Sequence, residues 1–159
     1  FELMFSYQDC ITDPVERLKK IGEAYFYFYE QYPDHFRLLN DIHIPGKLNP
    51  GTADRVHSQL RDRIKSIWEL NMSIIRDGMD AGVFKESTDP VEVAVSFWAI
   101  STAMINMHDY KKSIQQGISH DGGDMPFGDF NFLDVISVNA KRIIFTIMKN
   151  PPADFNMML

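Results

Sequence analysis

The sequence contains very little cysteine and no long unbroken run of apolar residues. Cys10 is the single cysteine among 159 residues, which excludes an internal disulfide framework and favours a reducing compartment. No stretch approaches the roughly 18 apolar residues that a membrane-spanning helix needs. A charged segment followed by an apolar one, as in a signal peptide, is also lacking. We therefore expect a cytoplasmic protein.

Positive charge is in short supply as well. Sixteen Lys and Arg residues stand against 22 Asp and Glu residues, which gives a formal net charge of −6. A surface that binds duplex DNA is expected to be basic, because phosphate contacts dominate its affinity. The charge balance therefore indicates that these residues are not themselves the part of any protein that contacts nucleic acid.

The known motifs of catalysis and of metal binding are lacking too. The sequence has no HExxH, GxSxG or GxGxxG pattern, and Gly46-Lys47 lacks the upstream glycine of a P-loop. The five histidines are scattered, without the spacing of metal ligands. A glycine-rich loop is a better interpretation of His120, Asp121 and Asp124 than a cation site. We expect no enzymatic activity, no cofactor and no metal.

What the sequence does contain is clear helix punctuation. Asp13-Pro14 and Asp89-Pro90 each place a capping oxygen before a proline, which is typical of a helix start. Gly82 stands where a helix end needs a positive φ, and no alternating pattern long enough for a sheet is present. The sequence predicts an all-α bundle of about five to six helices, those expected here covering residues 14–32, 34–40, 52–81, 90–116 and 131–149.

Aromatic residues are abundant and clustered. Twelve Phe, six Tyr and two Trp residues are joined by nine Met residues, and residues 25–29 are five consecutive aromatics. On a helix these five cover the whole circumference, so the helix is expected to be buried all round or to face a cavity. The tyrosine hydroxyls favour a pocket wall, although plain core is the alternative for each residue. Helical stripes predict a ligand-binding set of Tyr25, Tyr29, Trp68, Met72, Phe97, Trp98, Met104 and His108.

The last two predicted helices each carry two apolar faces. One face serves the core of the chain, and the other needs a cover in an acidic protein. A two-fold homodimer supplies that cover through a four-helix bundle, and the alternative is a larger monomeric core. The predicted dimer interface comprises Val93, Ser96, Ile100, Ala103, Met107, Leu133, Ala140, Ile144 and Ile147.

Two passages resemble a known family. Residues 13–18 (Asp-Pro-Val-Glu-Arg-Leu) lead to a helix ending in Tyr-Pro and a short turn, residues 32–39 (Tyr-Pro-Asp-His-Phe-Arg-Leu-Leu). Residues 75–84 (Ile-Arg-Asp-Gly-Met-Asp-Ala-Gly-Val-Phe) precede Asp89-Pro90 and a helix with Trp98. In order and spacing these passages resemble the ligand-binding and dimerisation domain of TetR/AcrR-type transcriptional repressors, across nearly the whole chain.

The resemblance implies a division of the chain and a mechanism. Residues 1–11 would end the helix that links a missing N-terminal helix-turn-helix domain, residues 12–150 would bind effector and dimerise, and residues 151–159 would form a tail. An arbitrary cut in the sequence is the alternative for its beginning. A hydrophobic small molecule, such as an aromatic compound, a drug-like cation or an acyl chain, would alter the affinity for operator DNA. The alternatives are a helical interaction module, a cofactor or lipid carrier, and a small helical enzyme.

Overall fold

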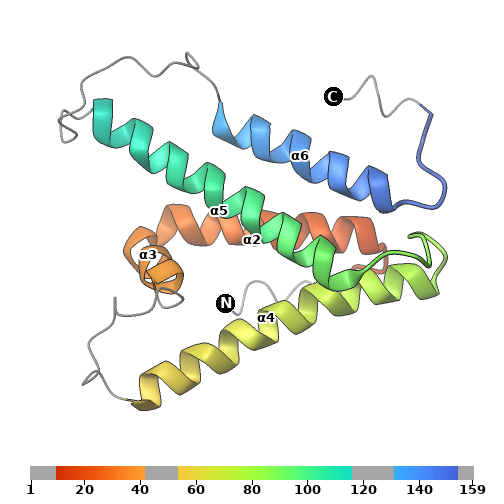
Figure 1. Ribbon diagram of the computed structural model, residues 1–159, viewed down its shortest axis with the longest axis horizontal. Helices are drawn as coiled ribbons and strands as arrows, with labels where there is room; N and C mark the ends of the chain where they lie inside the picture. Colours follow the sequence, from red (N-terminus) through yellow and green to blue (C-terminus); the bar gives the residue numbers. More distant parts are fainter. Residues whose placement is uncertain (1–9, 42–53, 116–130, 154–159) are drawn as a thin grey trace. The chain divides into compact units, whose positions relative to one another are not determined.

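The chain is helical wherever its regular structure is described. A computed structural model describes residues 10–41, 54–115 and 131–153 (Figure 1). Across these ranges it contains five helices and a single isolated β-bridge, which confirms the all-α fold class. The helices are α2 (Pro14–Gln31), α3 (Pro33–Asp41), α4 (Asp54–Asp80), α5 (Pro90–Gln115) and α6 (Phe132–Ile147).

Several predictions fall on parts of the chain outside the described ranges. They concern most of the linker segment 1–11, Thr52 at the expected start of the long helix, and residues 154–159 of the tail. The loop with His120, Asp121 and Asp124, and the Gly46-Lys47 pair, also lie outside the described residues. Those expectations remain predictions.

The predicted starts of α2, α5 and α6 are confirmed. A side-chain oxygen of Asp13 accepts a hydrogen bond from the backbone N–H of Val15 at 2.9 Å. Asp89 accepts in the same way from the N–H of Val91 at 2.8 Å, and Asn131 caps α6. Each cap satisfies a backbone donor that has no partner inside its helix. Pro14 and Pro90 then occupy the first helical position, where a missing N–H costs nothing.

Two helix ends have different causes, one in a neighbouring residue and the other in a residue that is distant in the sequence. Gly82 follows α4 with φ +69° and is the one residue with a positive φ among those described, as its sequence position predicts. The end of α6 is different, because the helix stops at Ile147, two residues before the predicted Lys149. Met148 and Lys149 leave the helix and pair with the turn around Phe84, in an antiparallel bridge between Phe84 and Met148.

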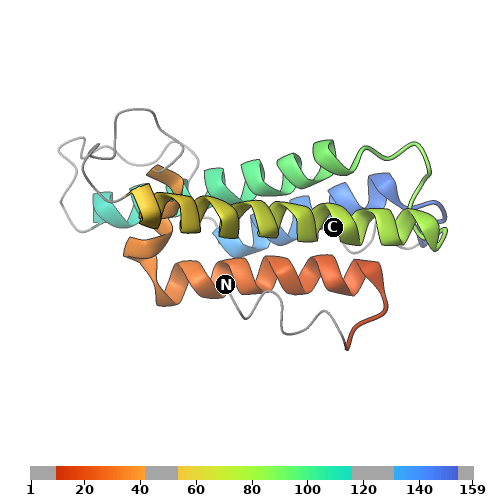
Figure 2. The ribbon, with the colours of Figure 1, turned by 90° about the horizontal axis from the view of Figure 1, so that it is seen from below.

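The chain divides into two compact units, Phe1–Ala81 and Gly82–Leu159. In the first unit, α2 packs against both α3 and α4. Helices α2 and α4 run antiparallel, with the start of α2 beside the end of α4 (Figures 1 and 2). The buried apolar side chains of this unit come from all three helices: Leu18, Ile21, Ala24, Tyr29, Phe36, Ile74 and Ile75.

In the second unit, α5 packs against α6. The two helices are antiparallel, because the C-terminal part of α5 meets the beginning of α6 (Figure 1). Phe84, which precedes α5, is completely buried and forms a β-bridge with Met148, the residue after α6. The buried apolar side chains of this unit are Phe84, Val93, Ala94, Ile105, Ile136 and Ile147.

Helix α5 is strongly apolar, although few of its residues are fully buried. By length and composition alone it could cross a membrane, yet only 17% of its most apolar 18-residue window is buried. Ser96, Ser101 and Thr102 interrupt the apolar stretch without adding charge, so a search for unbroken apolar runs does not find it. The helix therefore presents uncharged side chains that are mostly half-buried or exposed.

Candidate functional site

An aromatic cluster occupies the corner between α2 and α3. Phe36 is at its centre, with 2% of its surface exposed. The ring centroid of Phe36 lies 5.2 Å from that of Tyr25 and 5.3 Å from that of Tyr29, both in edge-on geometry. Pro33 builds this corner, because proline excludes helical geometry from the preceding Tyr32 and so separates α2 from α3. Two of the predicted ligand-binding residues are thereby brought together on one ring.

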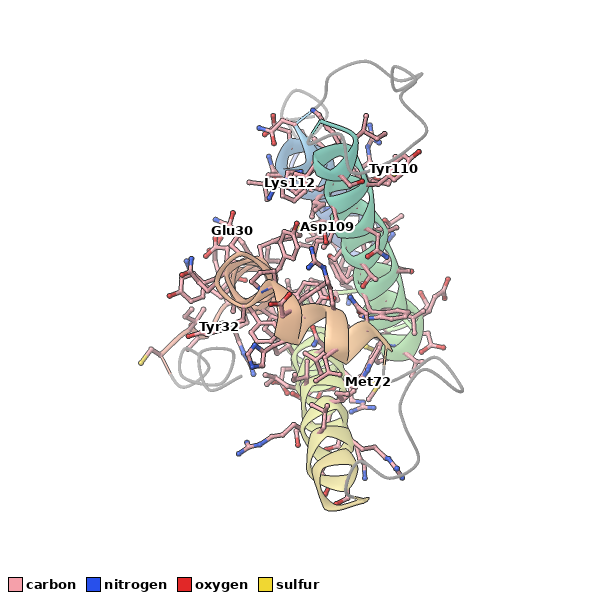
Figure 3. The ribbon with its side chains drawn as sticks, turned by 90° about the vertical axis from the view of Figure 1, so that its left-hand side faces the viewer. Glu30, Tyr32, Met72, Asp109, Tyr110 and Lys112 are labelled. Atoms are coloured by element: carbon pink, nitrogen blue, oxygen red, sulfur yellow. The ribbon has the colours of Figure 1, made fainter. Side chains whose placement is uncertain are left out.

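The outer edge of the corner is formed by a second set of rings. The Tyr32 ring lies 5.8 Å from that of Phe28 and 6.0 Å from that of His35. Tyr32 is exposed and lies on the outer side of the α2–α3 corner (Figure 3). The apolar cluster therefore reaches from a buried centre to the surface.

The expectation that residues 25–29 are covered all round is wrong for one direction. Tyr27 is 50% exposed, and it shares its side of α2 with the charged residues Glu23 and Glu30, which are also exposed. The physical reason is that a tyrosine has a polar hydroxyl that water satisfies, so aromatic spacing alone does not require burial. Periodicity identified the five rings but not which of them faces solvent.

An ion pair joins the two long helices of the first unit. The Arg17 guanidinium lies 2.7 Å from a carboxylate oxygen of Asp77, and the Arg17 side chain is only 15% exposed. The contact connects the beginning of α2 to the last turns of α4. It therefore fixes how these two helices meet at the end opposite to the aromatic corner.

The other predicted residues of the first unit lie on α4. Trp68 and Met72 are half-buried one turn apart, and Met72 is labelled in Figure 3. Between these two residues in the sequence, the Asn71 side chain donates to the Ile67 carbonyl at 2.8 Å. The Asn71 amide thus has a hydrogen-bond partner within its own helix.

The remaining predicted ligand residues all lie on α5, in the second unit. Phe97, Met104 and His108 are half-buried, whereas Trp98 is 40% exposed. The imidazole ring of His108 stacks on the ring of Phe132 at the start of α6, with centroids 3.8 Å apart. The eight residues therefore divide into one set of four in each unit, and the complete set stays a prediction.

No buried side chain among the described residues is polar or charged. A ligand that carries a charge deep into a protein needs a buried partner of opposite sign or a set of hydrogen bonds. Residues 10–41, 54–115 and 131–153 also contain no group of His, Cys, Asp and Glu that could hold a metal ion. The buried core of the described part of the chain is therefore apolar and aromatic.

Helix α5 has a long uncharged stretch with several exposed side chains. Residues 93–108 contain no Asp, Glu, Lys or Arg. Tyr110 is 47% exposed and projects from the side of α5 opposite to α6 (Figure 3). Val91 and Val95 are two further large apolar side chains exposed on this helix, and neither was predicted to be a site residue. Because residues 93–108 carry no charge on any side of the helix, periodicity gave no signal that could separate the covered face from the exposed one.

The predicted dimer residues differ in how accessible they are. Ala103 and Leu133 are exposed, whereas Val93 and Ile147 are buried within the chain. The other five predicted residues are half-buried: Ser96, Ile100, Met107, Ala140 and Ile144. The interface itself stays a prediction. In it, the exposed and half-buried residues would form the contact surface, and the buried Val93 and Ile147 would lie beneath that surface.

A comparison with protein-family models finds one match. Residues 14–118 match a family described as the tetracycline repressor-like C-terminal domain. A search of curated proteins and a search of solved structures each found no significant match.

Proposed function

This chain belongs to the tetracycline repressor-like C-terminal domain family, and we propose that it is the effector-sensing and dimerisation domain of a transcriptional repressor. The family match across residues 14–118 is the observation that carries the proposal. DNA binding would belong to an N-terminal helix-turn-helix domain, since the net charge of −6 does not suit a DNA-binding surface. The protein would act in the cytoplasm.

We propose a hydrophobic or aromatic small molecule as the effector. The predicted binding residues are aromatic side chains with Met72, Met104 and His108, and no buried charge lies among the described residues to hold a polar group. Flat or chain-like apolar ligands gain affinity from the area they bury. An organic cation could in addition lie against the aromatic faces. The aromatic members of the proposed binding set are Tyr25, Tyr29, Trp68, Phe97 and Trp98.

We further propose that the chain forms a homodimer through α5 and α6. The outward surface of α5 is uncharged over residues 93–108 and is poorly buried. Contiguous exposed apolar surfaces mark interaction sites, and an isologous pairing would cover the same surface on both copies. Two helices from each copy would form a four-helix bundle.

The proposed mechanism is a shift between two states. In a dimer, two recognition helices must stand about 34–36 Å apart to enter successive major grooves. An effector that binds better to a state with another spacing lowers the operator affinity by the ratio of its affinities for the two states. No catalytic step is part of this mechanism.

A thermal-shift screen of the chain against hydrophobic compounds tests the sensing function. A ligand that binds only the folded state stabilises it by RT ln(1 + [L]/Kd), which is about 2.7 kcal/mol at a hundredfold excess over Kd. We expect at least one aromatic, cationic or acyl-chain class to raise the melting temperature with dose. A flat response to all three classes would contradict the sensing function and would favour a helical protein-interaction module.

A further inference from the structure

Two short segments that are distant in the sequence pair at one end of the α5–α6 pair. They are residues 83–86, which follow α4, and residues 146–149 at the end of α6, and we call them together the terminal clasp. The backbone N–H of Lys85 donates to the Ile147 carbonyl at 2.8 Å, and that of Lys149 donates to the Val83 carbonyl at 2.9 Å. Between these bonds lies the antiparallel bridge of Phe84 with Met148.

Lys85 donates two hydrogen bonds to backbone carbonyls at the end of α6. The last carbonyls of a helix have no partner inside it. The Nζ of Lys85 donates to the carbonyl of Thr146 at 2.7 Å, and its backbone N–H donates to that of Ile147. The ammonium group also places a positive charge at the negative end of the helix dipole. Lys85 therefore caps α6 from a position that is 61 residues earlier in the chain.

The weaker contacts of the clasp lie on its exposed side. Lys149 and Glu86 form an ion pair with 3.5 Å between nitrogen and oxygen, and both side chains are well exposed. A pair of this kind contributes little, because water screens it. The side chain of Phe84, which is completely buried, and the Lys85 caps are therefore the parts that hold the clasp together.

The contacts at the two ends of the α5–α6 pair differ in kind. Where α5 ends and α6 begins, the ring of His108 stacks on the ring of Phe132. At the other end the clasp holds α6 by its final residues. The terminal clasp thus holds its end of the pair with directional backbone hydrogen bonds.

We propose that Lys85, through the terminal clasp, fixes the C-terminal half of α6 on α5 and thereby keeps the self-association surface intact. The second part of this inference rests on the proposed homodimer. Ile144 and Ile147 both belong to the predicted interface set, and Ile147 is buried within the chain. Both residues lie in the last turn of α6, which Lys85 caps. Loosening that turn displaces both side chains without changing any interface residue.

Amide hydrogen exchange on the whole chain, followed by NMR, tests the first part. Lys85→Met removes the Nζ donor and its charge while keeping the length of the side chain. We expect the amides of Lys149 and of residues 144–148 to exchange at least tenfold faster, because the clasp opens more often. Amides in the middle of α2, such as those of Ile21 and Ala24, should keep their rates within twofold.

Two further variants make the result decisive. Lys85→Arg keeps the charge and a donor, and should restore slow exchange at Lys149. Lys19→Met is the matched control, since it removes only an exposed ion pair with Glu16 inside α2, and should change none of these rates. An unchanged rate at Lys149 in Lys85→Met overturns the inference. A uniform rise at all amides also overturns it, because that pattern indicates a general loss of stability.

Sedimentation equilibrium on the same variants tests the second part. We expect Lys85→Met to raise the dimer dissociation constant about tenfold, whereas Lys85→Arg and Lys19→Met leave it unchanged. A dimer of unchanged affinity, with a clasp that exchanges faster, overturns the link to self-association. A wild-type chain that is monomeric at every concentration instead overturns the proposed homodimer, and the exchange pattern then decides by itself whether Lys85 fixes α6.

Discussion

The guanidinium of Arg17 and the carboxylate of Asp77 form an ion pair at 2.7 Å between the first turns of α2 and the last turns of α4. Arg17 belongs to a passage that resembles the start of a repressor ligand domain, and Asp77 belongs to the second such passage. The contact thus shows that the two passages, 60 residues apart in sequence, meet in the folded first unit. It also gives that unit one charged contact between helices at the end opposite to its aromatic corner.

Removing this ion pair should destabilise the chain modestly. We expect Arg17→Met to lower the free energy of unfolding by about 1 kcal/mol, because Arg17 is mostly buried whereas Asp77 is exposed to solvent. The loss should shrink at high salt, where screening weakens the wild-type pair. Urea denaturation at low and high salt measures both effects. Lys65→Met is the control, since it breaks only an exposed pair with Glu69 inside α4, and a loss as large in the control would refute the assignment.

The ring of Phe36 should hold the aromatic corner together. Phe36→Ala removes a completely buried ring that contacts Tyr25 and Tyr29, and the cavity should cost about 3–5 kcal/mol. The near-UV circular dichroism of the tyrosines should weaken as their edge-on contacts are lost. Leu38→Ala, an exposed position on the same short helix, should cost less than about 0.5 kcal/mol. Equal losses from the two variants would show that α3 does not pack as described.

Replacing glycine by alanine should have opposite signs at two positions. Gly82→Ala should destabilise by about 1 kcal/mol, since its φ of +69° is unfavourable for a residue with a Cβ. Gly22→Ala should stabilise by about 0.5–1 kcal/mol, because Gly22 lies inside α2. No atom lies within 4 Å of a Cβ at either position, so the backbone alone decides the sign. Thermal and urea denaturation measure both variants, and the same sign for both would contradict the conformation at Gly82.

The sequence predicted those features of the fold that depend on neighbouring residues. Asp13, Asp89 and Asn131 cap their helices because a side-chain oxygen reaches an N–H two residues away. Gly82 ends α4 for an equally local reason. The end of α6 was placed too late, because Met148 leaves the helix to pair with Phe84, a residue far away in the sequence. No local pattern contains that information.

The candidate surfaces were harder to predict than the helices. The stripe of aromatic residues located the corner around Phe36 but gave the wrong environment for Tyr27, because spacing does not tell a wall from a surface. On α5 the difficulty is composition, since a helix without charge over residues 93–108 has no polar side to mark its exposed face. The structure shows that Val93 is buried and Ala103 is exposed, a difference that helical periodicity did not predict.

A charge on the outward surface of α5 should split the proposed dimer. We expect Ala103→Arg to fold normally as a monomer, because Ala103 is exposed in the single chain. In a dimer the arginine would be buried without a partner, and the cost of about 3–5 kcal/mol would raise the dissociation constant at least a hundredfold. Sedimentation equilibrium measures this change, and far-UV circular dichroism checks that the helices are retained. Ala81→Arg, an exposed alanine just after α4, is the matched control and should leave the dimer intact. If Ala103→Arg associates as tightly as the wild-type chain, the interface does not include this side of α5.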